Sequence, residues 1–122
     1  MGKLILHIED NASNRKVVQH ILRRTPHRLL EAADGEAGLA LAASARPDLI
    51  LLDIQLPRLS GYQVAERLKA DPALRHIPVI AITSYALSGD DARALEAGCD
   101  DYLAKPYRPQ ALLERLGRYL SP

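Results

Sequence analysis

The chain has 122 residues, of which 48% are hydrophobic and 25% are charged, and its formal net charge is +1. This length predicts one domain, residues 1–122, with a single core, and so small a charge favours neither nucleic acid nor a membrane surface as a partner. A single cysteine, Cys99, excludes an intrachain disulfide and indicates a reducing, cytoplasmic compartment. No apolar run approaches the roughly 18 residues of a membrane helix, and a strand that begins at Lys3 leaves no room for a signal peptide.

Apolar runs alternate with segments of helical period, which is the pattern of repeated βα units around a parallel sheet. The first strand is expected over residues 3–8, and the helix after it ends at Pro26. The apolar face of this helix is expected to contain Val17, Val18, Ile21 and Leu22. A short second strand is expected over residues 28–32.

Asp34-Gly35 opens an alanine-rich helix that continues to about Ala45, before Pro47. The third strand, residues 48–52, is apolar enough to be buried on both faces of the sheet, and Asp53 follows it directly.

Capping boxes mark the starts of the next two helices. Ser60 and Gln63 begin a helix that presents Val64, Ala65 and Leu68 inward and is broken at Asp71-Pro72. The fourth strand covers residues 78–82 and reaches Thr83. The second capping box, residues 88–91, starts a helix that ends at Gly98, which suits a left-handed C-cap.

Residues 102–104 form the fifth expected strand, which Lys105-Pro106 closes, and Pro109 suits the first turn of a last helix. The inner face of that helix is expected to contain Leu112, Leu113, Leu116 and Leu120. Five strands, five helices and right-handed crossovers predict an α/β fold with a doubly wound parallel sheet.

Chemically useful side chains follow four of these strands: Glu9 and Asp10, then Asp53, Thr83 and Lys105. Ligands bind at the carboxyl ends of parallel strands. Three converging carboxylates about 4 Å apart repel by roughly 4 kcal/mol per pair at an effective dielectric constant of about 20. Such a cluster needs a cation or a shared proton, so a phosphoryl-transfer or Mg²⁺ site is the leading hypothesis. The alternative is that these acids only cap the next helix, as Asp10 or Asn11 could.

The chain resembles the receiver domain of two-component response regulators over essentially its whole length. The resemblance rests on Glu9-Asp10, Leu51-Leu52-Asp53 with Pro57 and Gly61, Thr83, the run from Ala97 to Tyr102, and Ala104-Lys105-Pro106. Residues 9–15 and 53–57 look most like stand-alone receivers of the DivK type and receivers of hybrid histidine kinases. The resemblance implies a flavodoxin-like fold with strand order 2-1-3-4-5.

The resemblance also implies roles for the acidic residues. Asp53 would be the nucleophile that takes a phosphoryl group from a phosphohistidine. Asp10 and Asp53 would bind Mg²⁺ directly together with the backbone carbonyl of Gln55, and Glu9 would act through a bound water. The reaction needs alignment and charge neutralisation more than covalent chemistry from the protein, which suits this residue set.

Thr83 and Lys105 would contact the phosphoryl oxygens, and the resemblance implies a cis Lys105-Pro106 bond that turns the ammonium toward the site. Phosphorylation would draw Thr83 toward the phosphate and let Tyr102 turn inward. The remodelled switch face would consist of Leu87, Leu95, Tyr102, Ala104, Tyr107 and Gln110. By the same resemblance, Gln55 and Tyr85 would tune dephosphorylation.

The resulting hypothesis is a single-domain response regulator that receives its phosphoryl group from a histidine kinase or a phosphotransfer protein and acts on a downstream protein. It would not be an independent enzyme, although it would assist its own phosphorylation and dephosphorylation, and a weak homodimer could use the switch face. A receiver excised from a hybrid kinase and a phosphorylation-independent binding module are the alternatives.

Two enzymatic or cofactor-binding alternatives fit poorly. A haloacid-dehalogenase-type phosphatase needs a second acid where Gln55 stands, and a flavodoxin-like cofactor binder needs a phosphate loop where Glu9-Asp10-Asn11 stands. The four histidines lack metal-ligand spacing, so each is expected to be structural or exposed.

Overall fold

The computed structural model describes residues 2–84 and 90–120, and within these ranges five strands alternate with five helices. The strands are β1 (Leu4–Ile8), β2 (Arg28–Ala32), β3 (Leu49–Asp53), β4 (Val79–Thr83) and β5 (Asp101–Ala104). The helices are α1 (Ala12–Leu22), α2 (Gly35–Ala45), α3 (Gly61–Ala70), α4 (Asp90–Glu96) and α5 (Pro109–Leu120). All neighbouring strands are parallel and their order is β2-β1-β3-β4-β5, which confirms the predicted doubly wound sheet.

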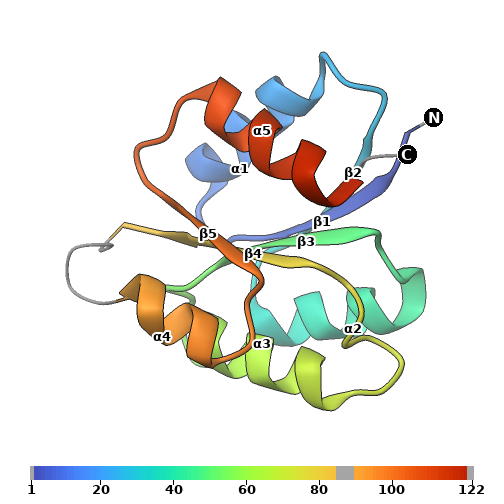
Figure 1. The fold of residues 1–122 in the computed structure, drawn as a ribbon, viewed down its shortest axis with the longest axis vertical. Helices are drawn as coiled ribbons and strands as arrows, with labels where there is room; N and C mark the ends of the chain where they lie inside the picture. Colours follow the sequence, from blue (N-terminus) through green and yellow to red (C-terminus); the bar gives the residue numbers. More distant parts are fainter. Residues whose placement is uncertain (1, 85–89, 121–122) are drawn as a thin grey trace.

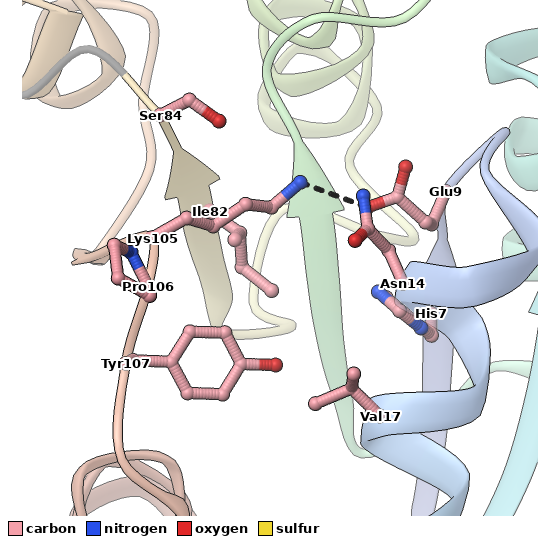
Figure 2. A pocket seen from close by; sticks show the side chains of 9 residues that line it. All are labelled: His7, Glu9, Asn14, Val17, Ile82, Ser84, Lys105, Pro106 and Tyr107. Atoms are coloured by element: carbon pink, nitrogen blue, oxygen red, sulfur yellow. Dashed lines mark hydrogen bonds and ion pairs between the residues drawn. The ribbon is translucent and has the colours of Figure 1, made fainter.

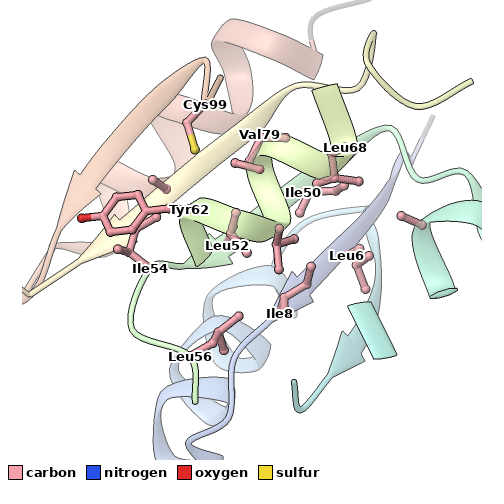
Figure 3. Packing of buried hydrophobic residues seen from close by; sticks show 14 of the residues in the cluster. Leu6, Ile8, Ile50, Leu52, Ile54, Leu56, Tyr62, Leu68, Val79 and Cys99 are labelled. Atoms are coloured by element: carbon pink, nitrogen blue, oxygen red, sulfur yellow. The ribbon is translucent and has the colours of Figure 1, made fainter. Parts of the chain in front are cut away.

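The sheet separates two apolar cores (Figure 1). Helices α1 and α5 cover one face, over a core that includes Ile5, Leu51 and Leu112. Helices α2, α3 and α4 cover the other face, where Leu6, Ile8, Ile50, Leu52, Leu68 and Cys99 pack together (Figure 3). Burial raises the pKa of the Cys99 thiol to about 12, with the nearby Asp100 carboxylate adding to the shift, so this cysteine is the small buried residue expected.

The central strand β3 places Asp53. Every residue from Leu49 to Asp53 is buried, because helices cover both faces of the sheet at this position. The parallel register sets Asp53 opposite Ile82 of β4, and it sets Leu52 opposite Ile8 of β1. The residues that follow β1, β3 and β4 therefore meet at one edge of the sheet.

Polar side chains begin the first three helices. The side chains of Asn11, Asp34 and Ser60 each accept a hydrogen bond from a backbone N–H in the first turn of α1, α2 and α3. Gln63 completes the predicted capping box, since its side chain accepts from the Ser60 backbone N–H. The second predicted capping box includes Ser88 and Gly89, which lie outside the described residues. Gly98 has the predicted positive φ, at +111°.

Two residues predicted for inner helix faces are exposed instead. Val17 is 47% exposed and Leu113 is 40% exposed. Adjacent helix positions point about 100° apart, so two neighbouring apolar residues at the border of the inner face can differ in burial. Val18 and Leu112 take the inward positions, which leaves Val17 and Leu113 on the outside of α1 and α5. No helix in residues 2–84 and 90–120 is long and apolar enough to cross a membrane.

Lys69 joins α3 to the segment before β4 and to the segment between α4 and β5. Its ammonium donates to the carbonyl oxygens of Arg75 and Ile77 at 3.1 and 2.9 Å, and to Asp100 Oδ2 at 3.0 Å. The same Asp100 oxygen accepts from the backbone N–H of Val79 at the start of β4. One side chain therefore satisfies three acceptors around the amino end of β4.

Replacing Lys69 with Met is expected to lower the free energy of unfolding by about 2 kcal/mol, because three hydrogen bonds to a charged donor are lost and the part-buried carbonyl of Ile77 loses this partner. Urea denaturation monitored by circular dichroism measures the change. Lys16→Met, at an exposed position of α1, is the matched control and is expected to stay within about 0.5 kcal/mol. Equal stability of the two variants would contradict this role of Lys69.

Candidate functional site

Three carboxylates converge at the carboxyl edge of the sheet, as predicted. Glu9 follows β1 directly and is 1% exposed, Asp53 ends β3 and is buried, and Asp10 is exposed. One oxygen from each residue lies within 4.8 Å of the other two. Asn11, and not Asp10, accepts the capping hydrogen bond of α1, at 2.9 Å from the Asn14 N–H. Capping of α1 therefore does not account for the carboxylate of Asp10.

Backbone hydrogen bonds hold the two buried carboxylates. The backbone N–H of Gln55 donates to Asp53 Oδ1 at 3.0 Å, which folds the chain after β3 against the cluster. The N–H of Asn11 donates to Glu9 Oε2 at 3.3 Å, and Arg15 Nη1 donates to the Glu9 carbonyl at 2.9 Å. The Gln55 and Asn11 N–H groups orient the two carboxylates and Arg15 holds the Glu9 backbone, so none of these contacts requires a bound ion.

Lys105 brings a positive charge to the cluster from the far end of the chain. Its Nζ lies 3.1 Å from Glu9 Oε1, in an ion pair whose carboxylate is buried. The Lys105-Pro106 peptide bond is cis, as the resemblance implied. The Lys105 backbone N–H donates to the Thr83 carbonyl at 2.7 Å, so the ends of β4 and β5 are joined beside the acidic residues.

The predicted switch residues lie on β4, β5 and their helices. Thr83 is completely buried and pairs in register with Ala104, while Tyr102 is half-buried and pairs with Ala81. Tyr102 packs on the same core as Ala81, under α4. The remaining members are Leu95, which is 47% exposed, exposed Gln110 and half-buried Tyr107. The predicted positions Leu87 and Tyr85 lie outside the described residues.

The charge balance of this edge favours a hard cation. Three carboxylates converge on one paired ammonium, and the nearby Arg15 guanidinium contacts the Glu9 backbone carbonyl rather than a carboxylate, so the cluster keeps a net negative charge. An oxygen-only donor set of this kind suits Mg²⁺, which typically takes one or two carboxylates and keeps several waters. The residues present therefore fit the predicted metal.

Sequence reasoning missed the environment of His7, which was expected to be an ordinary structural or exposed histidine. His7 is 1% exposed, and neither ring nitrogen has a hydrogen-bond partner among the described residues. Burial lowers the pKa of this imidazole to about 4, against the opposing effect of Glu9, so the ring is neutral at physiological pH. The alternation of side chains along β1 could have indicated that His7 is buried, since His7 lies on the same face of the strand as the buried Ile5.

Tyr107 lies near the same buried groups. Burial, with a smaller contribution from the Glu9 carboxylate, raises the pKa of its phenol to about 12. Tyr107 and His7 line one pocket of 520 Å³ that also reaches Glu9 and Lys105 (Figure 2).

A doubly wound parallel sheet that brings acidic residues, a threonine and a lysine to one edge defines a phospho-accepting signalling domain. The chain belongs to the response regulator receiver domain family, which it matches over residues 5–117.

Known proteins of two kinds resemble the chain over its full length. The polar-differentiation response regulator DivK of Brucella anthropi is 41% identical over 121 residues, with 99% of this chain and 98% of the relative covered. The receiver domain of the sensor histidine kinase PA1611 of Pseudomonas aeruginosa is 38% identical with a TM-score of 0.93, and both chains are covered completely. That structure has a magnesium ion coordinated in its active-site cleft.

A second similar structure is a putative response regulator of Chloroflexus aurantiacus, which is 28% identical with a TM-score of 0.95 and complete coverage of both chains. These comparisons confirm the predicted fold and the role of the chain as a phospho-accepting response regulator receiver in two-component signalling.

Proposed function

We propose that Asp53 is the residue that accepts the phosphoryl group. The observation that supports this assignment is the position of Asp53 among the acidic residues at the end of the central strand. One of its carboxylate oxygens would attack the phosphorus of a phosphohistidine as the P–N bond breaks and the imidazole leaves. Asp10 is too exposed and Glu9 is already paired with Lys105, so neither competes well as the acceptor.

Asp10, Asp53 and the backbone carbonyl of Gln55 would hold Mg²⁺, with Glu9 acting through a water molecule. The ion would supply charge neutralisation at the transferred oxygens. Lys105 would exchange its Glu9 partner for a phosphoryl oxygen, and Thr83 would donate its hydroxyl to another. The partner exchange of Lys105 is supported by the 3.1 Å ion pair that holds it at this edge.

Signal output would follow from the new position of Thr83. A phosphoryl group adds about −1.5 to −2 charges and three acceptor oxygens, which attract this hydroxyl. Movement of Thr83 would make room for Tyr102 on the shared face of β4 and β5. The exposed Leu95 and Gln110, together with Ala104, would then present a changed surface to a downstream protein.

In this role the chain would be a cytoplasmic stand-alone receiver served by a histidine kinase or a phosphotransfer protein, without independent enzymatic activity. It would assist only its own phosphorylation and dephosphorylation. The full-length similarity to DivK supports the stand-alone role, and the similarity to a kinase receiver supports the alternative of a hybrid-kinase module.

Phosphorylation is expected to require Mg²⁺, because the acidic cluster otherwise has a net negative charge that repels the arriving phosphoryl group. The measurement is intact-protein mass after incubation with acetyl phosphate, with Mg²⁺ or with EDTA. One adduct is expected with Mg²⁺ and none with EDTA.

Asp10→Asn is expected to weaken Mg²⁺ binding about tenfold or more, since even outer-shell partners of a metal contribute that much. Asp48→Asn is the matched control, because Asp48 is an exposed acid next to the opposite end of β3. Absence of both the adduct and Mg²⁺ binding in the wild type would instead indicate a constitutive binding module.

A further inference from the structure

The pocket that contains His7 is separate from the proposed acceptor. It lies between α1 and the segment that follows β5, has a volume of 520 Å³, and among the described residues neither Asp10 nor Asp53 lines it. Figure 2 shows Val17 and Asn14 of α1 on one side and Pro106 and Tyr107 on the other. Pockets that hold small organic ligands have volumes of roughly 300–1,000 Å³.

The buried His7 imidazole, which lines the pocket, is a polar group without a hydrogen-bond partner among the described residues. His7 comes from the buried strand β1, and both of its ring nitrogens lack a hydrogen-bond partner among the described residues. A neutral imidazole has one donor and one acceptor, and leaving such groups unpaired in the interior costs roughly 1–3 kcal/mol each. A buried side chain of this kind indicates a partner that the protein itself does not supply.

The walls of the pocket are apolar around this imidazole. Val17, Ile82, Pro106 and the ring of Tyr107 contribute carbon surface, and Val17 is an exposed apolar residue on an otherwise polar side of α1. Figure 2 shows the hydroxyl edge of Tyr107 directed toward α1, so a flat ring could pack against Val17 and the side of Tyr107 with a polar substituent directed toward His7. This contact would remove apolar surface from water.

The charged side chains that line the pocket disfavour an ionic occupant. Glu9 and Lys105 line the pocket and are already paired with each other at 3.1 Å. An anion would have to displace Glu9 from Lys105 while it approached the acidic residues of the site. A cation would have to approach the Lys105 ammonium. An uncharged molecule avoids both costs.

We propose that this pocket binds an uncharged aromatic molecule with one hydroxyl group, which packs against Val17 and Tyr107 and forms a hydrogen bond with His7. The binding does not depend on phosphorylation, so the Asp53→Asn variant is expected to bind the same molecule as well as the wild type. Failure of the proposed acceptor role would leave this result unchanged.

The experiment is an NMR titration of the full, unphosphorylated chain with 4-methylphenol and, in parallel, with toluene. The phenol is expected to shift the ring nitrogen signals of His7 and the amide signals of Val17 and Tyr107. Its affinity is expected to exceed that of toluene about tenfold, the value of one added hydrogen bond. His7→Leu is expected to remove this preference.

Two tryptophan variants locate the binding site without changing a buried residue. Val17→Trp fills the entrance and is expected to weaken phenol binding at least tenfold. Leu113→Trp is the matched control on α5, outside this pocket, and is expected to leave the affinity unchanged. The proposal is overturned if the phenol does not bind, if toluene binds equally well, or if Val17→Trp binds like the wild type.

Discussion

Asp53→Asn is expected to abolish the phosphoryl adduct while the fold is retained. The amide is not a nucleophile, and none of the remaining acids takes its place, since Glu9 is paired with Lys105 and Asp10 lies at the exposed end of the cluster. The measurement is intact-protein mass after incubation with Mg²⁺ and acetyl phosphate. A wild-type yield of adduct in the variant would assign the acceptor to another residue.

The same substitution also shows whether the adduct is lost because the nucleophile is missing or because the fold is disturbed. Asn keeps an Oδ1 atom that can accept the 3.0 Å hydrogen bond from the Gln55 N–H, and it removes one of three mutually repelling charges. Without Mg²⁺, the free energy of unfolding is therefore expected to rise by about 1 kcal/mol or more. Asp48→Asn is the control, because it changes an acid beside the same strand at the edge away from the site. This control is expected to be phosphorylated normally.

Gly61→Ala is expected to lower the free energy of unfolding by about 3 kcal/mol, in the upper range for an overpacked site. A Cβ at this position would lie 2.5 Å from the Cα of Ile54 and would also meet the carbonyl oxygen of Asp53. Both are backbone atoms that no rotamer change can move. Helix α3 would have to shift away from the end of β3.

The shift caused by Gly61→Ala is also expected to slow phosphorylation about tenfold or more, because a displacement of roughly 1 Å at reacting groups can cost a factor of about 10². Urea denaturation and the initial rate of adduct formation measure the two effects. Gly117→Ala in α5 is the matched control, since a Cβ there has no neighbour within 4 Å. It is expected to be neutral or to stabilise by up to about 1 kcal/mol. Equal behaviour of both variants would contradict the close approach at Gly61.

The order of elements and the edge that contains the site were predictable because local pattern and global fold agree. The run before Asp53 is apolar on both faces, which identifies a central parallel strand and therefore the direction of its last side chain. Ser60 and Gln63 likewise mark a helix start through their own hydrogen bonds. Both features depend on residues close together in the chain, so they can be predicted from the sequence.

Features that depend on distant packing were not predictable in the same way. The spacing of apolar residues did not show that Val17 and Leu113 lie outside, since each has an apolar neighbour that takes the inward position. Lys69 and its three acceptors come from segments up to 31 residues apart. The unpaired imidazole of His7 arises from what α1 and Tyr107 leave open above β1, and composition contains no information about that space.

The burial of β3 also affects how the proposed acceptor, Asp53, behaves when the protein fluctuates. Segments with completely buried backbone open only in near-global unfolding and exchange their amide hydrogens most slowly. Leu49 to Asp53 form such a segment, hydrogen-bonded on both sides to β1 and β4. The backbone of Asp53 is therefore expected to stay in place when less buried parts of the surface open locally. Local opening of the surface would change the access of a phosphodonor to the Asp53 carboxylate but not the position of this carboxylate.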